Sequence, residues 1–112
     1  MTIKVYNKLV RDNIPTILKQ KGIEADAQIV KNDQAYKRLL CRKLIEEARE
    51  AAVADETHLL EELGDIETVI DALLDLNNSS RVELEVIKDQ KDARRGRFIK
   101  RIFLKTTTEG GA

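Results

Sequence analysis

The stretch DQAYKRLLCRKLIEEAREAAVADETHLLEELGDIETVIDALLDL, residues 33–76, decides the fold. Its apolar side chains recur every three or four residues, which is the period of an α-helix with one face against a core. We therefore predict one helix over about residues 33–55 and a second over about residues 57–76, closed by Asn77 and Asn78. The connection between them is short, and we expect the two helices to form an antiparallel hairpin that turns near residue 56.

Two further helices are indicated on either side of this hairpin. A short one is predicted after a cap at Asp12 or Asn13, because a proline stands in its first turn and a glycine follows it. Another is predicted over residues 80–96, since Ser80 and Glu83 have the spacing of a capping box and a glycine closes the segment.

The predicted fold class is all-α, a helical hairpin within a bundle of about four helices. The apolar residues of the 57–76 helix cover roughly half of its circumference, more than one partner helix can bury. We therefore expect a four-helix bundle completed by oligomerisation. At 112 residues the chain fits one domain, predicted at residues 1–105 with a flexible tail at 106–112. Residues 98–105 carry β-formers and are expected to be a short extended segment, either a strand or an arm.

Composition excludes several classes of function. The chain has Lys+Arg 20 and Asp+Glu 20, so its net charge of zero argues against a nucleic acid polymer or a membrane as partner. No apolar run is long enough to cross a bilayer. Cys41 is the single cysteine, which excludes an internal disulfide and fits a cytoplasmic protein.

The apolar faces of the hairpin carry four acidic residues on or beside them: Glu47, Glu50, Glu62 and Asp65. A charged side chain is costly to bury on such a face. The four residues form two pairs, each three residues apart and therefore on one helix face. A hairpin that turns near residue 56 places Glu50 level with Glu62, and Glu47 level with Asp65. Four carboxylates at two adjacent levels repel one another unless a cation lies between them. Oxygen ligands without His or Cys favour Mg²⁺ or Mn²⁺ over zinc.

The alternative is that these acids form surface salt bridges with Arg42, Lys43 or Arg49. His58 has no partners for a catalytic relay and is interpreted as a bystander or a local cap. Cys41 is interpreted as a small packing residue rather than a nucleophile.

The acidic motifs also resemble those of a known family. EEARE, residues 46–50, followed by ELGD, residues 62–65, resembles the EExxE…ExxD signature of the MazG-like, all-α nucleoside triphosphate pyrophosphohydrolase superfamily. YNKLVRDNIP, residues 6–15, and RGRFIKRIFL, residues 95–104, are similar to its small single-domain, phosphoribosyl-ATP pyrophosphohydrolase-like branch. Asn13 and Arg97 depart from the pattern of that branch.

This resemblance implies Mg²⁺-dependent hydrolysis of a nucleoside triphosphate, including a non-canonical one, to the monophosphate and pyrophosphate. Mn²⁺ is a potential substitute, and the protein is expected to be a homodimer or homotetramer. The metal ligands implied are Glu47, Glu50, Glu62 and Asp65. Glu46 would lie beside them and orient or deprotonate the attacking water, so the implied catalytic residues are Glu46 and Glu47.

The phosphates of such a substrate need cations, and the resembling flanks supply Lys8, Arg11 and Arg95 as candidates. Two alternatives stay open. One is a phosphoribosyl-ATP pyrophosphohydrolase, with the same chemistry on another substrate. The other is a non-catalytic helical oligomerisation or nucleotide-sensing module. The base of the nucleotide is not readable from the sequence.

Overall fold

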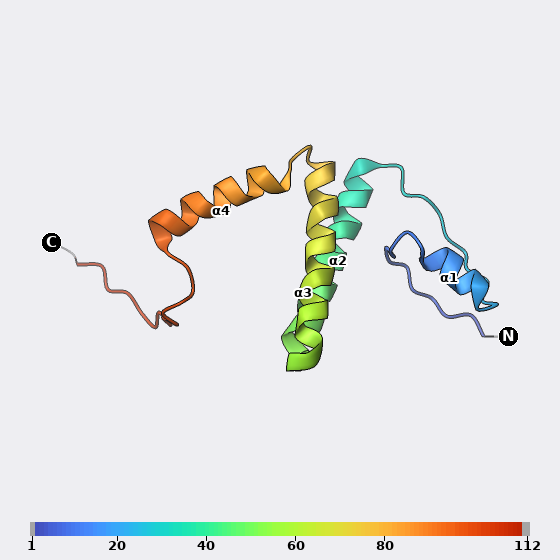
Figure 1. The fold of residues 1–112 in the computed structure, drawn as a ribbon, viewed down its shortest axis with the longest axis horizontal. Coiled ribbons are helices and arrows are strands. Elements are labelled where there is room, and N and C mark those ends of the chain that lie inside the picture. Colours follow the sequence, from blue (N-terminus) through green and yellow to red (C-terminus); the bar gives the residue numbers. More distant parts are fainter. Residues whose placement is uncertain (1, 111–112) are drawn as a thin grey trace. The chain divides into compact units, whose positions relative to one another are not determined.

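The computed structural model describes residues 2–110 and confirms the all-α fold class. Within these residues it contains helices and no strand (Figure 1). The helices are α1 (Ile14–Gln20), α2 (Asp33–Val53), α3 (Glu56–Leu76) and α4 (Arg81–Arg95).

Polar residues precede the helices. Asn13 precedes α1, which has proline in its first turn, but the Asn13 side chain makes no capping hydrogen bond. Asn32 caps α2 and Asp55 caps α3, each accepting a hydrogen bond from a backbone N–H of the first turn. Ser80 accepts the backbone N–H of Glu83 and donates to its carboxylate, which is the predicted capping box of α4.

Glycines mark the ends of the two outer helices. Gly22 follows α1 with φ 75°, and Gly96 follows α4 with φ 77°. This left-handed backbone conformation is easily adopted only by a residue without a Cβ atom, so both stops are fixed by residue type. Residues 97–110 contain neither helix nor strand, so the strand considered for residues 98–105 does not form, and Phe98 is fully exposed.

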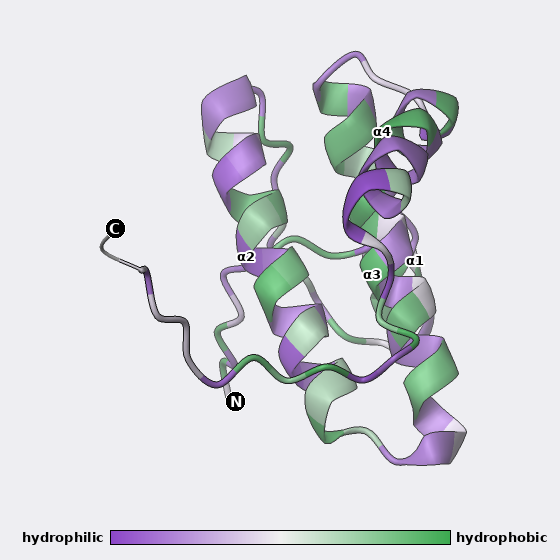
Figure 2. Cartoon of the chain, turned by 90° about the vertical axis from the view of Figure 1, so that its left-hand side faces the viewer, coloured by the Kyte–Doolittle hydropathy of each residue, from purple (hydrophilic) through white to green (hydrophobic). Residues whose placement is uncertain are grey.

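The chain divides into two compact units, residues 1–79 and 80–112. In the first unit α2 and α3 pack along each other as the predicted antiparallel hairpin, joined by only two residues (Figure 1). Apolar and hydrophilic residues alternate along both helices (Figure 2). Leu40 of α2 and Val69 of α3 are the buried hydrophobic residues of the hairpin.

Much of the apolar surface of the first unit stays exposed. Leu60 of α3 is 79% exposed, and Leu59 and Leu63 of the same helix are also exposed. Among the described residues, none of the helices has the length and apolarity that crossing a membrane requires. Residues 111 and 112 of the predicted tail lie outside the described residues.

Candidate functional site

Three carboxylates converge between the two helices of the hairpin. Glu47 of α2 and Glu62 and Asp65 of α3 each place one carboxylate oxygen within 4.8 Å of the others. The antiparallel packing brings them together, as the predicted matching of Glu47 with Asp65 requires. These residue types offer only oxygen ligands, which suit a hard divalent cation.

Burial distinguishes this cluster from a group of acids on a surface. Glu47 is only 7% exposed, and its Oε2 is buried without a hydrogen-bond partner. Oε2 of Glu62 is buried without a partner as well. A buried carboxylate oxygen that accepts no hydrogen bond loses its hydration without compensation. Two such atoms in one cluster fit the coordination of a cation.

The electrostatics of Glu47 are consistent with this interpretation. Burial raises the pKa of Glu47, and the nearby carboxylate of Glu50 raises it further. Lys43 opposes the shift, because its Nζ lies 3.5 Å from Oε1 of Glu47. Lys43 therefore pairs with Oε1 of Glu47, while Oε2 has no hydrogen-bond partner.

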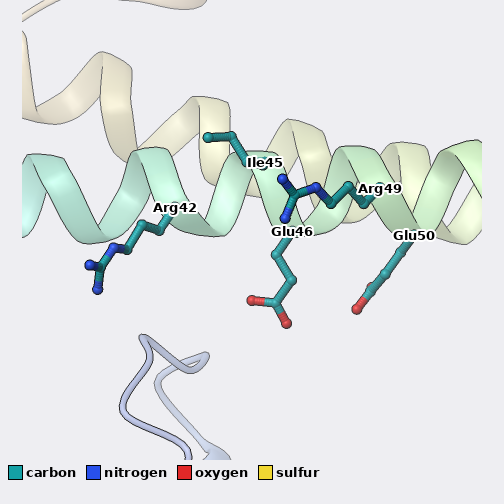
Figure 3. Close-up of a pocket in the computed structure, with 5 residues that line it drawn as sticks. All are labelled: Arg42, Ile45, Glu46, Arg49 and Glu50. Atoms are coloured by element: carbon teal, nitrogen blue, oxygen red, sulfur yellow. The ribbon is translucent and has the colours of Figure 1, made fainter.

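The other two acids of the first motif lie at the edge of the cluster. Glu50 is exposed and stands outside the group of three, although its charge acts on Glu47. Glu46 accepts a hydrogen bond of 2.9 Å from Nζ of Lys8, and this bond lowers the pKa of Glu46. Figure 3 shows Glu46 and Glu50 extending from the same side of α2, with Arg42 beside them. Together with Ile45 and Arg49, these residues line a pocket of about 440 Å³.

Two of the predicted phosphate ligands form ion pairs with acidic residues of the hairpin. Lys8 pairs with Glu46, and Nη2 of Arg11 donates a hydrogen bond of 2.7 Å to Oδ1 of Asp65. The same nitrogen lies 3.4 Å from Oγ1 of Thr68. The third candidate, Arg95, ends α4 in the second unit, and its role stays a prediction.

The salt-bridge alternative describes part of this arrangement. Lys43 lies within 4.0 Å of both Glu46 and Glu47, at the helical spacings of three and four residues.

Thr68 was missed by the sequence reasoning, although its position three residues after Asp65 places both on one face of α3. Its hydroxyl donates to the carbonyl of Gly64 and thereby fixes its lone pairs near Arg11.

The remaining reactive side chains are His58 and Cys41. Nδ1 of His58 lies 2.7 Å from Oδ1 of Asp55, so His58 contacts the residue that caps α3 and is not itself the cap. Cys41 is a free, partly buried cysteine of α2.

Comparisons with known proteins add no relative from which the site could be interpreted. No family model, curated protein or solved structure matched this chain. The chemistry of the acidic cluster therefore has to be argued from its own geometry.

Proposed function

We propose that this protein is a Mg²⁺-dependent nucleotide pyrophosphohydrolase, which converts a nucleoside triphosphate to the monophosphate and pyrophosphate. One observation carries the proposal. Glu47, Glu62 and Asp65 converge within 4.8 Å, and the first two each bury an oxygen that has no partner. Such a cluster stabilises a divalent cation, and Mn²⁺ would substitute for Mg²⁺ because it prefers the same ligands.

The three converging carboxylates would hold the ion, with Glu50 completing the set from the exposed side. A bound ion neutralises charge that develops on the phosphates and lowers the pKa of a coordinated water. Cleavage itself breaks the bond between the α-phosphorus and the oxygen that bridges it to the β-phosphorus. Water adds its oxygen to the α-phosphorus and loses a proton, and pyrophosphate leaves.

The residues around the cluster have matching roles in this reaction. Glu46 stands next to Glu47 and would orient the attacking water. The hydrogen bond from Lys8 lowers the pKa of Glu46, which weakens its carboxylate as an acceptor of the proton of that water. Lys8 and Arg11 bring positive charge to the acidic edge, where the phosphates of the substrate need it.

The assembly proposed with this activity is a homodimer or homotetramer in the cytoplasm. Exposed Leu59, Leu60 and Leu63 support self-association, because an apolar face of this kind is usually buried against another subunit. The single cysteine fits the reducing cytoplasm.

The proposal is tested by pyrophosphate release from a panel of ribo- and deoxynucleoside triphosphates together with phosphoribosyl-ATP, in Mg²⁺ and in EDTA. Turnover should require the metal and fall more than about 100-fold in Glu47→Gln and in Asp65→Asn, since each removes a ligand charge but keeps the shape. Glu61→Gln is the matched control, because Glu61 is exposed and stands outside the cluster.

The panel also separates the alternatives. If phosphoribosyl-ATP is the only compound hydrolysed, then it is the substrate in place of a nucleoside triphosphate. Turnover that persists in EDTA would contradict the metal dependence proposed here. A complete lack of turnover would contradict the enzyme and favour a non-catalytic helical module.

A further inference from the structure

The irregular N-terminal segment supplies two positive charges to the hairpin from far away in the sequence. Arg11 reaches Asp65, 54 residues away, and Lys8 reaches Glu46, 38 residues away. The two contacts are not equivalent. Asp65 is one of the three converging carboxylates, whereas Glu46 stands outside that group.

Arg11 thus occupies an oxygen of a proposed metal ligand. The distance of 2.7 Å from its Nη2 to Oδ1 of Asp65 is that of a charge-assisted hydrogen bond. A divalent cation coordinated by Asp65 would repel the guanidinium and compete with it for the same carboxylate. The Arg11 side chain is 57% exposed, so it can leave without opening the packed hairpin.

We propose that Arg11 is an exchangeable counterion of the acidic cluster. It neutralises Asp65 in the metal-free protein, a divalent cation displaces it, and the released guanidinium then binds a phosphate of the substrate. This inference rests on the proposed function, because it takes the acidic cluster to be the metal site.

The exchange has two consequences of opposite sign. Binding of the metal alone must break the pair between Arg11 and Asp65, so Arg11 weakens metal affinity. Binding of a phosphate chain to the metal-loaded protein gives Arg11 a new anionic partner, so Arg11 strengthens phosphate affinity. A residue that merely holds the N-terminal segment in place would affect both affinities in the same direction.

The test compares Arg11→Gln with Lys4→Gln in the whole chain. Both changes remove one positive charge from the same segment, but Lys4 lies over the ring of Tyr6, whereas Arg11 pairs with a residue of the cluster. Mn²⁺ affinity is measured without phosphate, from the electron paramagnetic resonance signal of the free ion. Arg11→Gln should bind Mn²⁺ about two- to fivefold more tightly than the parent, as expected from the loss of one exposed ion pair. Lys4→Gln should change the affinity less than about twofold.

The second measurement is calorimetric titration of the Mn²⁺-saturated proteins with inorganic tripolyphosphate, which carries the phosphates without a base. Arg11→Gln should bind it about tenfold or more weakly, since a charge-assisted hydrogen bond to phosphate is lost. Arg11→Lys keeps the charge and should bind Mn²⁺ like the parent.

The outcomes distinguish this inference from the proposed function. If Arg11→Gln leaves Mn²⁺ affinity unchanged or lowers it while Glu47→Gln abolishes Mn²⁺ binding, the metal site stands and the exchange is wrong. If the parent binds no Mn²⁺, or if Glu47→Gln binds it as well as the parent, the metal site and the exchange both fail.

Discussion

Burial of the charged Glu47 side chain destabilises the folded protein when no metal is bound. The side chain is almost completely buried and left with one unpaired oxygen. In the metal-free protein Glu47→Gln should therefore raise the free energy of unfolding, by about 1 kcal/mol, because a neutral amide costs less to bury. Urea unfolding in EDTA measures this change, with Glu61→Gln as the control.

In excess Mg²⁺ the parent should instead be more stable than Glu47→Gln. The ion stabilises only the folded parent protein, which keeps the full set of ligands, by mass action. A Glu47→Gln protein that is less stable than the parent in EDTA would show that Glu47 contributes to the fold itself.

The raised pKa of Glu47 makes the same effect depend on pH. Because the pKa is higher in the folded state than in the unfolded state, the destabilisation from its charge is fully present above the folded pKa. It is relieved as the pH falls through that pKa. The stability difference between the parent and Glu47→Gln in EDTA should thus shrink on acidification.

Stabilisation of the parent by Mg²⁺ should decline over the same range, since protons and the metal compete for the carboxylate. Thermal unfolding of both proteins across a pH series, with and without Mg²⁺, measures the two trends. A difference between the proteins that is constant with pH would contradict them.

At the scale of the helices, the caps allow a direct comparison of a charged and a neutral side chain. Asp55 caps α3 and accepts hydrogen bonds from the backbone and ring of His58, which lower the pKa of Asp55. Its contribution to stability is present above the unfolded pKa and is lost as the pH falls through the lowered folded pKa. Asp55→Ala should thus lower the melting temperature at neutral pH and have little effect in strong acid.

Asn32 caps α2 with an uncharged amide and serves as the matched control. Asn32→Ala should cost about 1 kcal/mol at every pH at which the protein folds, because the amide does not titrate. Equal pH dependence of the two variants, followed by thermal unfolding, would contradict the role of the Asp55 charge.

Residue types at helix ends explain why the helices could be predicted. Caps, glycines and apolar period act within a few residues, so they report local structure directly. The level matching of Glu47 with Asp65 follows from the helix rise once the chain is taken to turn near residue 56. Glu50, in contrast, was expected among the ligands but stands outside the group of three, because helical level does not determine where a long side chain points.

The N-terminal contribution to the site could not be derived from periodicity. Lys8 and Arg11 lie in a segment without regular structure, and their partners are 38 and 54 residues away. Only the family resemblance drew attention to them. Tertiary contacts of an irregular segment leave no pattern in the neighbouring sequence.

At the scale of the whole molecule, the zero net charge conceals a strong separation of charge along the sequence. The α3 segment contains seven acidic residues and no Lys or Arg, whereas residues 94–105 contain six Lys or Arg and no acid. Both segments also expose large apolar side chains, among them Leu60 and Phe98. Opposite charges and apolar surface on one chain favour association between copies.

We therefore expect the protein to self-associate, with a mass of two or four chains in size-exclusion chromatography with light scattering. Leu60→Asp should weaken the association at least about tenfold, since it places a charge on an apolar face that a second subunit would cover. Val82→Asp makes a similar change at an exposed position of α4, in the second unit, and is the control.

If the apolar contacts dominate, moderate NaCl should change the mass little, whereas a large decrease with NaCl would assign the association to the charged segments. A parent protein that remains monomeric at high concentration would contradict the shared bundle, and the hairpin would then have to bind its substrate alone.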